Sequence, residues 1–129
     1  MERNYLIDSS VAVDYLSGKL PEKGMGFMHA VMSHIPNFSV ITKIEILGYK
    51  ARPEVNDFLS EFMNDSVIYK LSNECVEQAI ELKKEYKMHT PDAIIAATAL
   101  VHGLILITQN SNEFDRIEDL EILNPYDSD

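Results

Sequence analysis

One stretch in the last third of the chain decides the fold: Thr90-Pro-Asp-Ala-Ile-Ile-Ala-Ala-Thr-Ala-Leu-Val-His-Gly-Leu-Ile-Leu-Ile-Thr108. It opens with a capping residue followed by proline at the first helical position, and Gly103 suits the left-handed residue that ends a helix. The part from Ala93 to Ile107 carries no formally charged side chain, but it is shorter than the ~18–20 residues that a membrane span needs. The stretch therefore predicts a buried helix over 90–102 and a buried strand over 104–108.

Outward from this stretch, short apolar runs alternate with segments of helical periodicity. Predicted strands cover residues 5–7, 38–41, 66–71, 104–108 and 120–123. Predicted helices cover residues 9–16, 22–34, 42–50, 53–64, 72–86 and 90–102, and the helix over 72–86 is expected to bury Val76, Ala79 and Ile80. Because the central strands are apolar throughout, we expect an α/β fold of three layers, in which helices cover both faces of a mainly parallel sheet of four to five strands.

The composition indicates one domain. With 129 residues, 46% of them apolar, the chain can build a single core, which we expect over residues 1–125 with a frayed tail over 126–129. The lone cysteine, Cys75, excludes an internal disulfide. A net charge of −10 disfavours long-range attraction to a nucleic-acid backbone or an anionic membrane. It still allows a small acidic pocket that recruits a divalent cation and acts on phosphate through it.

The N-terminal segment does not resemble a secretion signal. Its apolar run, Tyr5-Leu-Ile, is short and ends at Asp8. We therefore expect a cytoplasmic protein without membrane contact.

Four acidic residues fall at one edge of the predicted sheet. Asp8 directly follows the first strand, Glu45 lies about one helical turn after the second, Asp92 begins the helix over 90–102, and Glu113 lies in the loop after the fourth strand. Ligands of open parallel sheets bind beyond the carboxyl ends of the strands. Carboxylates gathered there repel one another unless a hard cation holds them, and Mg²⁺ or Mn²⁺ suits a site made of oxygen ligands. This edge is therefore the candidate metal and catalytic site.

Each acidic residue also has a structural explanation. Glu45 completes a capping box with Thr42, and Asp92 complements the dipole of its helix. Glu113 fits a solvated loop. Asp8 is the hardest to explain in this way, because the end of a strand in an apolar sheet is a poor place for an unpaired carboxylate.

Four segments carry a resemblance to a known family. They are Tyr5–Leu16, Ser39–Tyr49, Thr90–Gly103 and Leu106–Phe114. In order and spacing they resemble the PIN-domain family, metal-dependent nucleases named after the PilT N-terminus, and within it the VapC-type toxins of bacterial toxin–antitoxin pairs. The match runs across nearly the whole chain, and the third segment is its most specific part.

The resemblance implies a PIN-like fold and an endoribonuclease that uses Mg²⁺ or Mn²⁺. Asp8, Glu45 and Asp92 fall on the acidic triad of the family, and Glu113 falls on its fourth acidic position. Gln109 stands where many relatives have an arginine. Three further residues are candidates for orienting the carboxylates or the substrate: Ser9, Thr108 and Asn110.

The resemblance also implies partners: an RNA substrate, a cognate antitoxin and a second copy of the chain in a homodimer. Two apolar helix faces are candidate surfaces for the antitoxin or the dimer, although ordinary core is the usual explanation of such faces. They are Phe27/Met28/Val31/Met32 and Phe58/Phe62/Met63. Lys43, Lys50 and Arg52 are the basic residues expected nearest the mouth of the site.

Other functions stay open. The main alternative is a catalytically silent PIN fold that acts only by binding RNA or protein. A phosphoaccepting receiver domain would need a second acidic residue at the end of the first strand, and a haloacid-dehalogenase-type phosphatase would need an aspartate where Ser10 stands.

Overall fold

The computed structural model describes residues 4–127, which form one parallel sheet and the helices around it. The strands are β1 (Tyr5–Ile7), β2 (Asn37–Ser39), β3 (Val67–Tyr69), β4 (Ile105–Ile107) and β5 (Ile122–Leu123). The helices are α1 (Ser9–Leu16), α2 (Glu22–Met32), α3 (Val40–Leu47), α4 (Pro53–Asn64), α5 (Asn73–Tyr86), α6 (Thr90–His102) and α7 (Ser111–Phe114). The strand order is β3-β2-β1-β4-β5, with every pair parallel.

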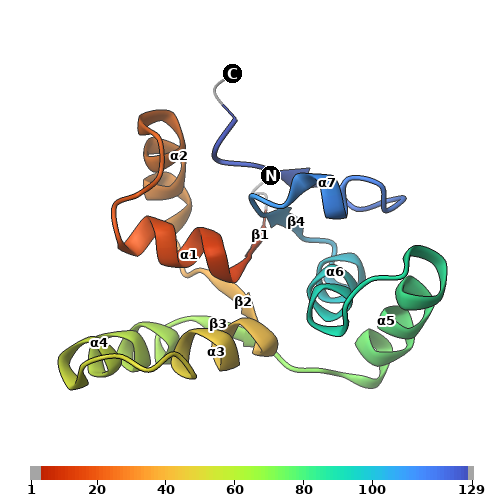
Figure 1. Ribbon diagram of the computed structural model, residues 1–129, viewed down its shortest axis with the longest axis horizontal. Helices are drawn as coiled ribbons and strands as arrows, with labels where there is room; N and C mark the ends of the chain where they lie inside the picture. Colours follow the sequence, from red (N-terminus) through yellow and green to blue (C-terminus); the bar gives the residue numbers. More distant parts are fainter. Residues whose placement is uncertain (1–3, 128–129) are drawn as a thin grey trace.

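Neighbouring residues of the central strands β1 and β4 belong to two separate hydrophobic cores. Leu6 and Leu106 pack on the side of α5 and α6, whereas Ile7 and Ile107 pack on the side of α1 to α4. All four side chains are essentially inaccessible to solvent, because successive residues of a strand point to opposite faces. Figure 1 shows the α5–α6 pair on one side of the strands and α1 to α4 on the other. The predicted three-layer α/β fold is confirmed.

The deciding stretch behaves as its sequence predicts. Residues 93–99 of α6 are all buried, and Gly103 ends the helix with a φ of 64°. Leu104 then leads into β4, which lies in the middle of the sheet between β1 and β5. The uncharged stretch is therefore the centre of one core, and none of the described helices is long and apolar enough to cross a bilayer.

The start of α3 differs from the prediction. The strand expected over 38–41 ends at Ser39, and the helix expected to begin at Thr42 begins at Val40. The cause is a stronger cap, since the Ser39 side chain accepts a hydrogen bond from the Ile41 N–H at 3.1 Å. The helix α7 was not predicted, because four residues are too few to show a helical period.

Two side chains expected in the core are exposed. Val76 is 37% and Ile80 47% exposed, while Cys75, Ala79 and Leu82 are buried. The buried set follows i, i+4, i+7 spacing, so α5 presents that face to α6. Val76 and Ile80 each follow a core residue by one position, about 100° around the helix, so their predicted burial was wrong.

The C-terminal residues are fastened to the N-terminal half. The Tyr126 hydroxyl donates a hydrogen bond to Asp14 on α1. The carbonyl of Pro125 lies against Gly24 of α2, where an added Cβ would stand 2.0 Å from the carbonyl oxygen. Tyr126 thus has a defined contact within the tail expected to fray, while residues 128 and 129 lie outside the described part.

Candidate active site

Asp8 is fixed by the pairing of the two central strands. The register sets Ile7 opposite Ile107, and the Asp8 N–H donates to the Ile107 carbonyl at 2.9 Å. The residues that follow these strands, Asp8 and Thr108, therefore come side by side. The Thr108 hydroxyl donates to Asp8 Oδ2 at 2.8 Å, and the Ser9 N–H donates to Asp8 Oδ1 at 2.8 Å.

Thr108 is itself held in place. It is fully buried, and its hydroxyl oxygen accepts a hydrogen bond from the Asn110 N–H at 3.0 Å. Because the Thr108 hydroxyl donates a hydrogen bond to Asp8 and accepts one from the Asn110 N–H, its orientation is fixed. Asn110 therefore acts on the site through its backbone in this arrangement.

Ser9 connects Asp8 to the second carboxylate. Its hydroxyl donates a hydrogen bond to Glu45 Oε1, and its Oγ lies 3.5 Å from Oγ1 of the buried Thr42. The contact joins α1 to α3. The alternative capping box of Thr42 and Glu45 is absent, because α3 begins at Val40 and uses Ser39 as its cap.

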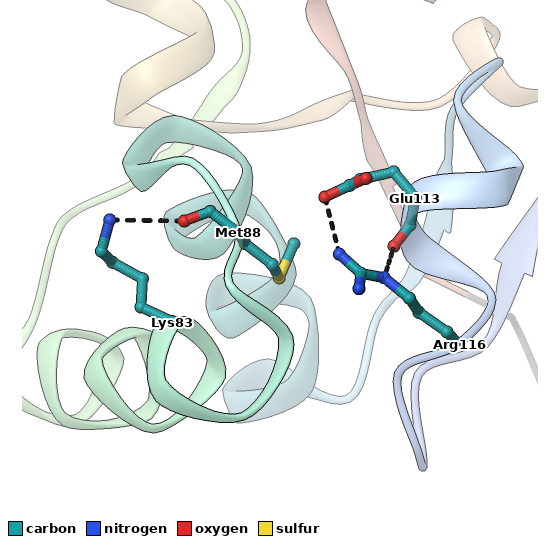
Figure 2. Close-up of polar contacts among 4 residues, drawn as sticks. All are labelled: Lys83, Met88, Glu113 and Arg116. Atoms are coloured by element: carbon teal, nitrogen blue, oxygen red, sulfur yellow. Dashed lines mark hydrogen bonds and ion pairs between the residues drawn. The ribbon is translucent and has the colours of Figure 1, made fainter.

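Asp92 lies in the first turn of α6. The turn before it is anchored by Lys83, whose Nζ donates to Thr90 Oγ1 at 2.9 Å and to the Met88 carbonyl at 3.3 Å; Figure 2 shows the contact with Met88. α6 therefore starts from a fixed position and presents Asp92 to the same edge as Asp8.

The other three carboxylates affect the pKa of Asp92. Burial raises the pKa of Asp92 above its ordinary value of 3.8, and the nearby charges of three carboxylates raise it further, against a smaller opposing effect of His89. Those carboxylates are Asp8, Glu113 and Glu45. The other three sequence-predicted acidic residues thus all act on Asp92.

Burial also raises the pKa of Asp8. The hydrogen bonds from Thr108 and Ser9 favour the ionised form and oppose this shift, while the charge of Glu45 adds to it. The direction stays upward from 3.8. Two neighbouring aspartates therefore resist ionisation in the metal-free protein.

Glu113 lies on α7 and is paired with a cation that the sequence interpretation missed. Arg116 Nη2 lies 2.9 Å from Glu113 Oε1, and its Nε donates to the Glu113 carbonyl at 3.1 Å (Figure 2). An opposite charge three residues after Glu113 is the spacing of a helical ion pair, and this signal could have identified Arg116.

A cleft runs from the carboxylates along apolar side chains. Its volume is about 1040 Å³. Three of the four predicted acidic residues line it: Asp8, Glu45 and Asp92. The walls come from α1, the end of α3 and α4, with the side chains Val13, Leu16, Tyr49, Val55, Phe58 and Leu59. Of the basic residues, Lys19 lines the cleft, whereas Lys43, Lys50 and Arg52, which were expected at its mouth, do not.

The donor chemistry fits a hard divalent cation. Asp8, Glu45, Asp92 and Glu113 offer only oxygen atoms, as Mg²⁺ and Mn²⁺ prefer. Among residues 4–127, no three His, Cys, Asp or Glu side chains are arranged as a ready metal site. Glu113 is paired with the Arg116 cation, whereas Asp8 and Glu45 accept hydrogen bonds from neutral groups. The metal-binding and catalytic roles of the four residues stay predictions.

Comparison with known proteins identifies the family. The family model described as PIN domain matches residues 5–120. A stretch of 47 residues is 43% identical to Ribonuclease VapC1 of Rickettsia felis, covering 36% of this chain and 35% of that protein.

Solved structures match over nearly the full length. A toxin-antitoxin complex from Klebsiella pneumoniae contains a chain with a TM-score of 0.78 and 27% identity, covering 97% of this chain and 100% of that one. DNA-bound VapBC from Salmonella typhimurium has a TM-score of 0.80 at 20% identity, covering 96% and 99%, which is a likeness of fold alone. Since the family model spans β1 to β4 and all four carboxylates, the chain belongs to the PIN domain family.

Proposed function

We propose that the chain is a divalent-metal-dependent endoribonuclease, the toxin component of a type II toxin–antitoxin pair. The observation that carries the proposal is that Asp8, Glu45 and Asp92, from three separate segments, line one cleft. Burial and three neighbouring carboxylates raise the pKa of Asp92, an arrangement that costs stability unless a cation relieves it. Mg²⁺ or Mn²⁺ is the class of cation that fits oxygen ligands and phosphate chemistry.

The similarity to named proteins supports the same activity. The stretch shared with Ribonuclease VapC1 is 43% identical, and the Klebsiella structure is described as a toxin-antitoxin complex. RNA is the substrate class suggested by the first of these names, and an antitoxin is the partner suggested by the second.

The protein groups have separate tasks in the proposed reaction. Asp8 and Asp92 are the main metal ligands, and Thr108 with the Ser9 N–H keeps the Asp8 carboxylate in one orientation. Ser9 holds Glu45 at the rim through its hydroxyl. A bound cation supplies charge neutralisation at the scissile phosphate and activation of the attacking water.

The chemistry is hydrolysis of a phosphodiester. The oxygen of water bonds to phosphorus, the bond from phosphorus to the 3′ oxygen breaks, and that oxygen takes up a proton. The fragments therefore carry a 3′ hydroxyl and a 5′ phosphate.

Incubating the protein with total cellular RNA tests the proposal. We expect discrete fragments in Mn²⁺ or Mg²⁺, none with EDTA, and none with the Asp8→Asn variant. Mapping the fragment ends identifies the target RNA. Full activity of Asp8→Asn, or cleavage that persists in EDTA, contradicts the assignment, while metal binding without any cut ends favours the silent binding module.

The apolar cleft supports the antitoxin part of the proposal. Phe58 is 55% exposed and Val13 46%, and both line the same cleft as Asp8 and Asp92. An apolar segment that carries a basic residue complements both parts of this surface. We propose that the antitoxin places such a segment here, with the basic residue at the carboxylates.

Replacing Phe58 with aspartate tests this contact. An exposed aromatic side chain in a binding groove is a typical hot spot, so we expect Phe58→Asp to weaken antitoxin binding by about 30-fold or more while the free chain still cleaves RNA. The control is Ile35→Asp, since Ile35 is 67% exposed and lines a separate, smaller pocket. Affinity is measured by calorimetry with the purified antitoxin. Equal binding by both variants excludes the cleft as the contact.

The homodimer and the cytoplasmic location stay predictions. Of the two candidate faces, Met28 and Met63 are fully buried in the core. Phe27 lines the smaller pocket, and Phe58 lines the cleft. These faces are therefore core in part, and Phe58 is their most exposed member.

A further inference from the structure

Arg116 is held in place by three contacts, two of them with Glu113, whose N–H donates at 3.1 Å to the carbonyl of Asn110, the residue that bonds Thr108. Its Nη2 pairs with Glu113, its Nε donates to the Glu113 carbonyl, and its guanidinium lies 5.6 Å from the centre of the Tyr86 ring. Tyr86 is fixed in turn, because its hydroxyl accepts a hydrogen bond from the Glu118 N–H at 3.3 Å. The guanidinium thus stands between α7 and the end of α5, beside a carboxylate whose charge acts on Asp92.

These contacts leave several N–H donors of the guanidinium free to bind another anion. An arginine has five N–H donors, and the two hydrogen bonds to Glu113 use two of them. The Arg116 side chain is 42% exposed. A guanidinium that is already oriented and still has free donors loses little entropy when it binds a further anion, and its fork geometry matches phosphate.

The negative charge around the cleft would repel RNA unless a cationic side chain such as Arg116 contacted the phosphates. The chain carries −10 overall, and the cleft itself is lined by Lys19 against five acidic side chains, which are Asp8, Asp14, Glu45, Glu54 and Asp92. A polyanion that approaches these carboxylates is repelled unless cations stand at the rim. Gln109, at the position where many PIN relatives have arginine, supplies no charge there.

We propose that Arg116 is a substrate-binding residue that contacts a backbone phosphate of the RNA next to the cleavage site. The ion pair with Glu113 holds the guanidinium in position for that phosphate. This inference rests on the proposed ribonuclease function and adds a residue to it. The competing explanation is an ordinary ion pair that only stabilises the short helix α7.

RNA binding without cleavage tests the proposal. The probe is a fluorescein-labelled single-stranded RNA of mixed sequence, titrated by anisotropy at several NaCl concentrations against Asp8→Asn protein with Mn²⁺ present. Arg116→Gln in this background is expected to raise Kd about 5- to 30-fold. It should also reduce the salt dependence by about 0.7 in the slope of log K against log salt, the value for one phosphate contact on a single strand.

Two further variants separate a phosphate contact from a structural role. Arg116→Lys keeps the charge and should restore the salt slope but only part of the affinity. Lys84→Gln removes an exposed cation of α5 and should change neither quantity. Mn²⁺ affinity of the Arg116→Gln chain should rise, because a positive charge has been taken from beside the carboxylates.

The results decide between the explanations. Weaker RNA binding together with tighter Mn²⁺ binding supports the proposal, since loss of structure would weaken both. An unchanged Kd and salt slope in Arg116→Gln overturns it. Cleavage assays keep the two proposals apart: a wild-type chain that cuts no RNA refutes the ribonuclease, whereas a wild-type chain that cuts RNA with the same KM as Arg116→Gln refutes only the role of Arg116.

Discussion

Replacing Asp92 with asparagine is expected to abolish metal-dependent RNA cleavage and, at the same time, to raise the melting temperature of the metal-free protein. The loss of activity should be at least about 100-fold, which corresponds to about 2.7 kcal/mol of transition-state stabilisation. The amide oxygen of asparagine can contact a hard cation but carries no negative charge, so it binds the cation more weakly than a carboxylate does. The gain in melting temperature should be a few degrees, about 2–5 °C for a chain of this size.

The gain follows from the sign of the pKa shift. Burial and the charges of Asp8, Glu113 and Glu45 raise the pKa of Asp92 above 3.8. The folded state therefore binds this proton more tightly than the unfolded chain does, and stability is lost as pH rises through the raised pKa. Asparagine removes the charge that causes this loss.

Thermal unfolding in EDTA at several pH values checks the prediction. The advantage of Asp92→Asn over the wild type should shrink as pH falls from the raised pKa toward 3.8, below which Asp92 is neutral in both the folded and the unfolded state. Asp57→Asn, which removes an exposed carboxylate of α4, is the control and should change the melting temperature little. A destabilised Asp92→Asn protein at neutral pH would contradict the electrostatic account.

The second large effect is a steep loss of Mn²⁺ affinity as the pH falls through the raised pKa values of Asp8 and Asp92. The pKa values of Asp8 and Asp92 are both raised, and each carboxylate must release its proton before it can bind a cation. Affinity is therefore highest above both raised pKa values and falls as pH drops through them. The limit is about tenfold per pH unit for each proton displaced.

Calorimetric Mn²⁺ titrations across the neutral to mildly acidic range measure this slope. Repeating them in buffers of different ionisation enthalpy counts the protons released. The wild-type chain should release a net proton on binding at the acid end, and Asp92→Asn should release fewer. A pH-independent affinity would show that the carboxylates with raised pKa values do not hold the metal.

The part of the site set by strand pairing was predictable from sequence. Asp8 and Thr108 each follow an apolar run, and two parallel central strands must end at the same edge, so their proximity follows from the pattern alone. The helix that begins at Thr90 was predictable for a similar reason, because its proline and Gly103 mark both ends. These features follow from short sequence patterns, which are apolar runs, a proline and a glycine, and each pattern predicts the element that the structure contains.

The start of α3 and the exposure of Phe58 were not predictable, because each depends on which of several similar residues the rest of the chain contacts. Ser39 and Thr42 are both good caps, and the sequence alone does not decide between them; in the structure Ser39 caps α3 and Glu45 accepts a hydrogen bond from Ser9. Phe58 belongs to an apolar helix face, yet it is 55% exposed because α4 packs through Met63 and its neighbours and leaves Phe58 to the cleft. Periodicity shows that a face is apolar but not which of its residues the rest of the chain covers.

The hydrogen bond between Thr108 and Asp8 joins positions 100 residues apart. During synthesis on the ribosome, Asp8 leaves the exit tunnel long before the strand that precedes Thr108 has been made. Parallel pairing over such a separation also forms late in folding, because a long loop must close first. A nascent chain therefore carries its first aspartate without the partner that orients it, and the carboxylate site is assembled only once β4 has been inserted beside β1.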